Sequence, residues 1–468
     1  MGYIRILTIV LDILMRSKEM RSLLLCVVRF GSWVLVVLKI VTILFLMLSI
    51  PACGDKQVND SLSILCTGNE SFGEFLNSAV YEYEKHSGID VTLWEQISPY
   101  ATNPSTEDDY KAYEERLKAA IMAGDGPDIF VFNGLEVREE LYKMMDAGAF
   151  YDLNIFIKAD SDFHMDNYEK IVMDAGIYAD KRYLIPITYS VPHFIVSEEK
   201  LERFGVSIDD IGSYENLLDT ALTLLSANKS FFTNINQIRA TSRSVGWAGE
   251  VIDYENKKQN LDIDTFDRYM RFYKGEVDIR GKIGEGIYST SYQELLEYED
   301  GLLFSSETLR STLRVLYQGT DYDGIMILPI PNYRGNATAC VTHYAMISSS
   351  SVNRDNAWAF IKLLLGEDFQ KNISTFDTSL GNGVGVYSRL IDYNVDNYLK
   401  TNNMFESIPQ KYIDRIKNLY KNYDNAVVYG INGGMILQER YKNEYLASID
   451  IGMIKEDLNQ YYSIWLDE

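Results

Sequence analysis

The apolar and polar positions between residues 61 and 94 follow a strand, helix, strand order. The run 61–66 is apolar and short, as in a buried strand. A helical pattern then opens at the S-x-x-E capping box of Ser71 and Glu74 and closes at Gly88. A second strand is predicted over 89–94. Such a βαβ unit predicts a parallel sheet, because parallel neighbours need a crossover connection.

The same order repeats further along the chain. Residues 110–123 form an amphipathic helical pattern, and a third strand is predicted over 128–132 after the turn 124–127. An open sheet of this kind binds ligands beyond the carboxyl ends of its strands. Later predicted elements are strands at 183–187, 193–196, 324–330 and 343–347, a helix over 355–372, and a Tyr-rich helical segment over 411–468. No repeat or flexible linker separates these elements, so two lobes would have to be joined by short strands.

The first fifty residues differ in character from the rest. Basic side chains are scattered up to Lys39, residues 40–52 carry no charge, and Cys53 then precedes a polar stretch. A basic region, an apolar core and a small residue before a cysteine resemble a lipoprotein signal. We therefore expect residues 1–52 to be a signal peptide and Cys53 to carry the lipid. The alternative is an uncleaved span over 31–50, which is long enough to cross a bilayer. The leader is long, and Met20 is a second candidate start.

The remaining body is strongly acidic. Residues 53–468 hold 38 basic and 65 acidic side chains, within a chain whose hydrophobic share of 47% is that of a globular protein. A surface with this charge repels phosphate backbones, so nucleic acid is not expected as a partner. The charge does not predict a cationic ligand, because most of the carboxylates will face water.

Recognisable catalytic and metal-binding patterns are missing from the sequence. It contains no HExxH, GxSxG, phosphate-loop or EF-hand motif, and its four histidines are far apart. We therefore expect no enzyme activity, no cofactor and no metal. Cys66 and Cys340 show no zinc spacing and are expected to be buried free thiols, although the sequence leaves their pairing open.

Three stretches in order resemble the family 1 extracellular solute-binding proteins, whose best-known members bind maltose and other sugars. Residues 123–131 (AGDGPDIFV) are similar to a "GxxPDI" turn into a strand. Residues 180–186 (DKRYLIP) are similar to "GKxYxxP", with Asp180 in place of the usual glycine. Residues 356–364 (NAWAFIKLL) resemble an "AWxFIKfL" helix. Each motif alone is weak, but the ordered set behind a lipobox is fairly specific and spans most of the chain after the leader.

The resemblance implies an α/β protein with the two-lobed, type II periplasmic-binding-protein fold, in which hinge strands flank a ligand cleft. Lobe 1 is expected over 58–187 plus 345–400, and lobe 2 over 188–344 plus 401–468. Residues 53–57 would be the lipid-anchored linker. The hinge crossings are expected near 186–191 and 341–346. The implied partners are a sugar, the ABC permease subunits that receive it and, through the lipid, the outer face of the cell membrane. The protein is expected to act as a monomer.

A sugar site needs aromatic platforms and polar side chains that pair with hydroxyl groups. Position selects seven candidate ligand contacts: Asn69, Glu70, Phe132, Asn133, Tyr189, Trp247 and Ser306. The first four follow or end strands, Tyr189 lies beside the expected hinge, and Trp247 lies in a polar, glycine-containing stretch. Ser306 belongs to a stretch loosely similar to the family's "FxxGxAAM" region, whose usual downstream tryptophan is missing here. The alternative roles are helix capping, solvent exposure or core packing. The glycine-rich run 381–385 either closes over a ligand or simply connects elements.

Two other functions remain open at this stage. A surface glycan-processing enzyme would need two carboxylates facing each other at roughly 5–9.5 Å. A sensory module would present bound ligand to a membrane kinase instead of a permease, and neighbouring genes would separate it from a transporter. Peptides and polyols are alternative ligands. The sequence favours a carbohydrate-capturing lipoprotein of an ABC importer.

Overall fold

The structure is a computed structural model of the 468-residue chain. It divides the chain into two units, residues 1–58 and 59–468. It describes residues 61–66, 70–94, 106–133, 141–233, 252–253, 258–259, 262–283, 299–306, 308–318, 324–331, 337–373, 383–401 and 407–428, and a few isolated positions besides. The predicted signal peptide, the linker and Cys53 lie outside the described residues.

The larger of the two main sheets has seven strands in the order β14-β6-β13-β3-β1-β2, with β15 paired to β13. β1 pairs in parallel with β2 and β3, as predicted. β13 runs antiparallel to β3 and β6, so the sheet is mixed and not parallel throughout. The strands are β1 (Ser61–Cys66), β2 (Asp90–Trp94), β3 (Ile129–Asn133), β6 (Ile185–Ser190), β13 (Thr338–Ile347), β14 (Val384–Gly385) and β15 (Asn425–Val428).

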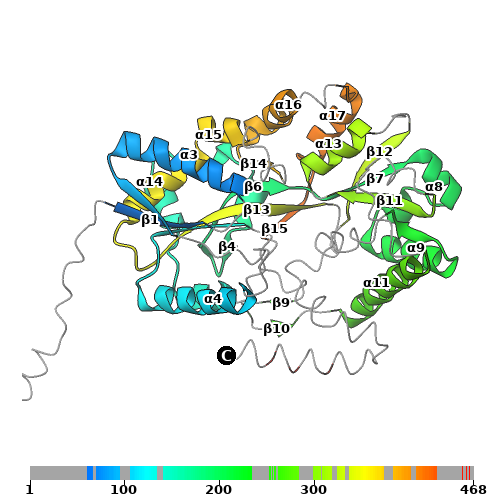
Figure 1. The fold of residues 1–468 in the computed structure, drawn as a ribbon, viewed down its shortest axis with the longest axis horizontal. Helices are drawn as coiled ribbons and strands as arrows, with labels where there is room; N and C mark the ends of the chain where they lie inside the picture. Colours follow the sequence, from blue (N-terminus) through cyan, green and yellow to red (C-terminus); the bar gives the residue numbers. More distant parts are fainter. Residues whose placement is uncertain are drawn as a thin grey trace, which may run out of the picture. The chain divides into compact units, whose positions relative to one another are not determined.

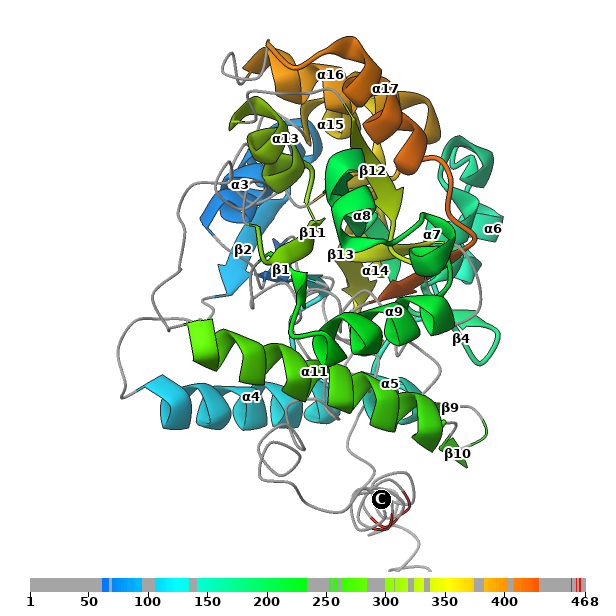
Figure 2. The same ribbon diagram turned by 90° about the vertical axis from the view of Figure 1, so that its right-hand side faces the viewer.

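Helices cover both faces of the larger sheet. α3, α14 and α15 lie on one face and α4 on the other (Figures 1 and 2). α3 ends as predicted, because Gly88 takes a left-handed φ of 70° and its amide donates to the Glu84 carbonyl. The single helix predicted over 355–372 is wrong: Gly366 is extended, with φ −62° and ψ 146°, and separates two helices. These helices are α3 (Glu70–Ser87), α4 (Thr106–Ala123), α14 (Arg354–Leu365) and α15 (Glu367–Asn372).

The smaller sheet has the strand order β12-β7-β11-β8. Its strands are β7 (His193–Ser197), β8 (Ser230–Phe232), β11 (Gly301–Ser306) and β12 (Ile325–Pro329). α9 and α11 pack against each other beside this sheet, and α13 lies on its other side (Figures 1 and 2). The helices around it are α8 (Glu198–Phe204), α9 (Tyr214–Ser226), α11 (Ile263–Ile283) and α13 (Leu309–Gln318).

Short elements make up the remaining described structure. Between β3 and β6 lie α5 (Leu141–Asp146), α6 (Asn154–Ala159), η1 (Met165–Asn167), α7 (Lys170–Asp174), β4 (Ile177–Tyr178) and β5 (Lys181–Arg182). The others are η2 (Asp209–Ile211), β9 (Ile252–Asp253), β10 (Lys258–Gln259), η5 (Ser388–Leu390), α16 (Ile391–Thr401) and α17 (Gln410–Leu419).

The chain passes from one sheet to the other at two places. β6 ends in the larger sheet at Ser190 and β7 starts in the smaller sheet at His193, so the first crossing is at 191–192. The second lies between the end of β12 and the start of β13, at 330–337. These positions lie just after and just before the predicted hinge segments. The C-terminal segment, predicted to be helical, holds α17 and then β15, a strand of the larger sheet. The lobe boundaries themselves stay a prediction.

Apolar side chains make up most of the buried positions of both sheets. All six residues of β6 and β11, and all ten of β13, are buried, so these strands are covered on both faces. Burying such strands is the main favourable contribution to folding. Among the described residues, none of the helices combines the length and the apolar character needed to cross a membrane.

Candidate functional site

The carboxyl ends of β1 and β3 mark the predicted binding edge of the larger sheet. β1 and β3 are parallel neighbours, so the residues that follow them emerge at the same edge. Asn69 lies outside the described residues, as does Trp247. Glu70 begins α3 and Asn133 ends β3, which places both backbones at this edge. Their contact with a ligand stays a prediction.

The two aromatic candidates lie in the core. Phe132 is buried beside Phe130 and packs edge-on against Tyr344, with ring centres 5.8 Å apart. Tyr189 is fully buried, and its hydroxyl donates a 2.8 Å hydrogen bond to the Tyr420 carbonyl. Burial raises the pKa of Tyr189 well above its ordinary value, so the hydroxyl stays protonated and remains a donor. In this conformation the contacts of both side chains are structural.

Ser306 ends β11 within a cluster of hydroxyl groups. Its Oγ lies 2.9 Å from Thr312 Oγ1 and 2.5 Å from Ser311 Oγ, and it donates to the Thr308 carbonyl at 3.1 Å. Thr308 and Ser311 are half-buried, whereas Ser306 and Thr312 are buried. The cluster fixes the turn between β11 and α13, where the resemblance places a ligand contact.

His193 connects this cluster to the first crossing. Its Nδ1 donates to the Val191 carbonyl at 2.8 Å, which leaves Nε2 to accept from the Thr312 hydroxyl at 2.6 Å. In the β7–β11 ladder it lies opposite Ser306. Burial lowers the pKa of His193 to about 4, so the ring is neutral at pH 7.

A second buried histidine lies in the larger sheet. His343 pairs with Asn133 in the β13–β3 ladder and with Thr188 in the β13–β6 ladder. Its Nδ1 is 2.8 Å from Thr188 Oγ1, which lies 2.7 Å from Thr342 Oγ1. Burial lowers the pKa of His343 to about 3. The sequence carried no signal that His193 would lie beside the first crossing or His343 within β13.

The first motif stretch is organised by Asp128. Its Oδ2 accepts from the Ser63 amide at 2.9 Å and the Ser63 hydroxyl at 2.7 Å, and its Oδ1 accepts from Ser351 Oγ at 2.6 Å. Gly124 precedes it with a left-handed φ of 80°. The carboxylate therefore fastens β1, the start of β3 and the approach to α14, which is a structural role.

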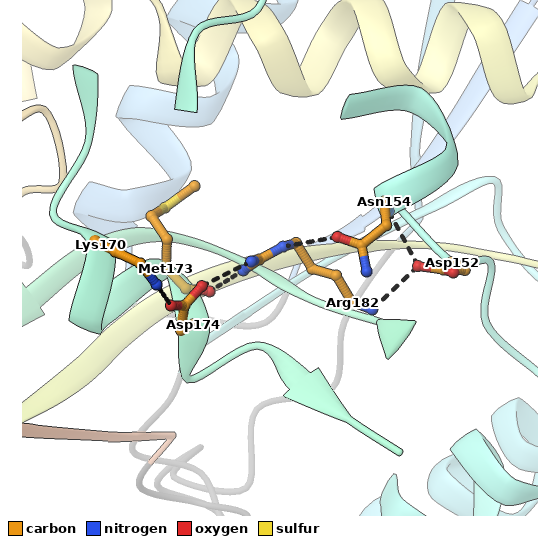
Figure 3. Close-up of polar contacts among 6 residues, drawn as sticks. All are labelled: Asp152, Asn154, Lys170, Met173, Asp174 and Arg182. Carbon is orange, nitrogen blue, oxygen red and sulfur yellow. Dashed lines mark hydrogen bonds and ion pairs between the residues drawn. The ribbon is translucent and has the colours of Figure 1, made fainter. Parts of the chain in front are cut away.

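The second motif stretch is organised by Arg182, which is buried (Figure 3). Its guanidinium donates to the Asp174 carboxylate at 2.9 Å, to the Met173 carbonyl, and to Asn154 Oδ1 at 3.4 Å. Its amide and that of Asn154 both donate to Asp152 Oδ1 at 3.0 Å. The network holds the hairpin that leads directly into β6 and the first crossing.

Asp180 lies at the tip of that hairpin, where the family's usual residue is glycine. Ala179 and Asp180 both have left-handed φ values, 47° and 61°. Glycine adopts this conformation at the least cost, and Asp tolerates it better than most residues. The departure from the motif therefore keeps the turn at some cost in stability.

The third motif stretch anchors α14. Trp358 stacks on Phe156 with ring centres 5.6 Å apart, and its Nε1 donates to Asp160 at 2.9 Å. Lys362, one turn further on, pairs with the same carboxylate at 2.6 Å. Hydrogen bonds from Lys362 and Trp358 lower the pKa of Asp160 to about 2. All three motifs thus maintain the larger sheet and do not form a catalytic centre.

Two further sequence expectations concern glycines and cysteines. Gly383 comes directly before β14 (Val384–Gly385), an edge strand of the larger sheet, and a Cβ on Gly383 would clash with the Tyr189 backbone. This part of the glycine-rich run is therefore a close backbone approach. Cys66 is half-buried and Cys340 is buried, and neither forms a disulfide in the structure. They do not pair with each other.

Two mixed sheets joined by short crossing segments, with helices around each, form the architecture of the two-lobed periplasmic binding proteins. The family model for bacterial extracellular solute-binding proteins matches residues 68–371. The chain therefore belongs to the bacterial extracellular solute-binding protein family.

Solved structures agree with this assignment at low sequence identity. The sugar-binding protein MalE from Xanthomonas citri is 13% identical, with a TM-score of 0.55 over 87% of this chain and 97% of that one. An oligogalacturonide-binding protein from Yersinia enterocolitica is 15% identical, with a TM-score of 0.52 over 87% and 99%. A family 1 solute-binding protein from Alicyclobacillus acidocaldarius is 13% identical, with a TM-score of 0.53 over 87% and 98%. At these identities the likeness shows the shared fold. No curated protein matches the chain by sequence.

Proposed function

We propose that the protein captures a carbohydrate outside the cell and delivers it to the permease of an ABC importer. The observation that carries the proposal is the family match over residues 68–371. Structures of similar fold include proteins named for binding sugars, oligogalacturonides, cycloalternan and mannobiose. An aromatic content of 13% supplies apolar faces of the kind that sugar rings stack on.

We propose that the ligand lies between the lobes, at the loops after β1, β3 and β11. Asn69, Glu70 and Asn133 would supply polar contacts from the larger sheet, and Ser306 from the smaller one. Trp247 would supply an apolar platform. Phe132 and Tyr189 would support these residues from beneath, since both are buried in the described conformation.

We propose that the protein has no catalytic role and that a lipid on Cys53 holds it at the outer face of the membrane. The sequence before Cys53 supports the anchor. Incubating the protein with glycans tests the first point, since a cleaved product would contradict it. Mass spectrometry of the membrane-extracted protein tests the second, because an N-terminus at Met1 or Met20 without acyl groups would contradict it.

A thermal-shift screen tests the ligand class. The protein lacking residues 1–53 is mixed with maltose, mannobiose, mannotriose and oligogalacturonides, and separately with peptides and polyols. A ligand at about 100 times its Kd stabilises the folded state by roughly 2.7 kcal/mol, enough to raise Tm by a few degrees. A shift with one sugar class identifies the cargo. A shift only with peptides or polyols, from a protein that melts cooperatively, would overturn the carbohydrate proposal.

Two neighbouring serines then locate the site. Ser306→Ala removes a hydroxyl of the cluster that fixes the turn beside the proposed ligand, and we expect a loss of about tenfold in affinity for the identified sugar. Ser305→Ala is the control, because Ser305 is buried one residue earlier in β11 and its hydroxyl has no hydrogen-bond partner. Equal Kd values for both variants would remove Ser306 from the site.

A further inference from the structure

The C-terminal segment 410–428 connects the two sheets at a third place. α17 contacts β12, the edge strand of the smaller sheet, and β15 then pairs in parallel with β13 of the larger sheet. Figure 1 shows α17 beside β12, with β15 next to β13. Both ends of this segment are therefore fastened, but by contacts of different kinds.

The attachment to the larger sheet is made of many contacts. Four residues of β15 pair with β13. Between α17 and β15, the Tyr420 carbonyl accepts the buried hydroxyl of Tyr189, and the Tyr423 hydroxyl donates to Glu169 at 2.7 Å. Rings of Tyr420 and Tyr423 also pack on Tyr189, with centres 6.1 Å and 5.6 Å away. This end of the segment moves with the larger sheet.

Ion pairs fasten the helix to the same body. Lys417 pairs with Asp396 at 2.6 Å and Lys421 with Asp392 at 2.5 Å. Both aspartates belong to α16, which packs on β14 of the larger sheet. α17 is therefore joined to the larger sheet along its C-terminal half.

Among the described residues, the hydrogen bond from α17 to the smaller sheet is made by Arg415, whose side chain is exposed. Arg415 Nη1 donates to the Ile325 carbonyl at 2.5 Å, and its guanidinium lies 5.5 Å from the Tyr412 ring. The preceding carbonyl, that of Gly324, accepts from Glu198 on the β7 side. Because successive carbonyls of a strand point in opposite directions, that of Ile325 points away from β7, to the free edge of the sheet. Arg415 thus caps an edge strand that belongs to the other sheet.

We propose that segment 410–428 is a strap across the two sheets, and that the contact between Arg415 and Ile325 is the one that forms and breaks as the lobes move. The larger-sheet end is held by a ladder, buried tyrosines and two ion pairs. Among the described residues, the smaller-sheet end combines the contact of α17, which has a buried apolar face, with β12 and one hydrogen bond from an exposed guanidinium. Motion between the sheets opens the weaker attachment first. The contact therefore biases the unliganded protein toward the conformation described here. This inference needs only the two-lobed fold and is independent of the ligand's identity.

Single-molecule energy transfer tests the strap without any ligand. The full-length chain in detergent carries dyes on unnatural amino acids at Tyr81, on α3, and Ile208, beside η2, both exposed. Arg415→Met removes the hydrogen bond and keeps an apolar stem. One lost hydrogen bond of ordinary strength corresponds to about a fivefold change in an equilibrium. We expect the population whose inter-dye distance matches this structure to fall about fivefold relative to the alternative.

Arg389→Met is the matched control. Arg389 donates to Asn167 at 3.0 Å and lies over the Tyr387 ring, so it makes the same kinds of contact, but both partners lie beside the larger sheet. It should leave the distances unchanged. Arg415→Lys keeps the charge and should give an intermediate shift in the inter-dye distance populations. This variant tests the proposal if the Met variant does not fold. Wild-type distances in folded Arg415→Met, or in Arg415→Lys where the Met variant is unfolded, would overturn the proposal. Equal shifts for Arg389→Met would do the same.

Discussion

The larger and smaller sheets both have buried charged side chains, but they differ in the groups that join them to a neighbouring helix, α14 and α13 respectively. In the smaller sheet, Glu276 accepts from the Ser230 hydroxyl and the Phe231 amide, and Lys200 donates to the Gly301 carbonyl.

The larger sheet has buried or partly buried charged side chains at three tie points. Asp128 and Asp160 each join segments far apart in the sequence, and Arg182 joins nearby segments around the hairpin before β6. The smaller sheet is joined to α13 through neutral groups, with His193 and Thr312 at the centre. When one partner of a buried ion pair is removed, the other charge stays buried without compensation, which costs stability. The neutral join through His193 is instead weakened when the imidazole is protonated.

The largest effect is expected from breaking a charged tie point. Arg182→Met removes a buried guanidinium that pairs with Asp174 and donates to Met173 and Asn154. We expect the free energy of unfolding to fall by about 3 kcal/mol, because these acceptors lose their donor. Urea unfolding followed by circular dichroism measures it.

Lys170 provides the control within the same network. It pairs with the other oxygen of Asp174, but its side chain is 82% exposed, so Lys170→Met should cost less than about 0.5 kcal/mol. Equal losses for the two variants would show that the Asp174 charge, and not the buried guanidinium, stabilises the hairpin.

Local pattern decides which elements the sequence could predict. Strands β1 and β7 and helix α3 were predicted correctly because periodicity and caps are local signals. β8 and β11 were missed: they are short apolar runs, with no flanking pattern that separates a strand from a buried helix. The break at Gly366 was missed because a single glycine inside an amphipathic pattern is often tolerated.

The candidate site was less predictable than the fold. The sequence placed Glu70 and Asn133 at strand ends, and the structure agrees on their positions. It also proposed Phe132 and Tyr189 from their positions, yet both are buried. Whether an aromatic residue at a strand end faces a ligand or the core depends on which side of the sheet it points to and on what covers it. Tyr420, which lies 231 positions from Tyr189, could not be inferred from local pattern.

Lowering the pH should reduce the stability of the protein through two buried histidines, one in each sheet, and each should act over its own pH range. An unfolded histidine has a pKa near 6.5, whereas burial lowers those of His193 and His343 to about 4 and about 3. Below pH 6.5 the unfolded chain therefore binds protons that the folded chain excludes, and stability falls as the pH falls. Between pH 7 and 4.5, wild type should lose about 2–3 kcal/mol more than His193→Gln, measured by urea unfolding.

His343→Gln extends this comparison to the larger sheet. Its difference from wild type should keep growing between pH 4 and 3, where that of His193→Gln has levelled off, because the folded pKa of His343 is lower. Parallel pH curves for wild type and both variants would show that neither histidine is excluded from protonation in the folded protein.

The smallest effect concerns backbone conformation, and here too each sheet offers one position. Ala179 has a φ of 47° in the hairpin before β6, and Asn228 has a φ of 59° in the turn before β8. Alanine in the left-handed region costs roughly 1–2 kcal/mol, which glycine avoids, whereas asparagine adopts it more readily. Ala179→Gly should therefore raise the free energy of unfolding by about 0.5–1 kcal/mol, after the entropy that glycine adds to the unfolded chain. Asn228→Gly should change the free energy of unfolding by a few tenths of a kcal/mol at most, because asparagine is already suited to the turn.

Calorimetric Tm values measure both variants. A gain at Asn228 as large as that at Ala179 would mean that the turn before β8 is as strained as the hairpin before β6.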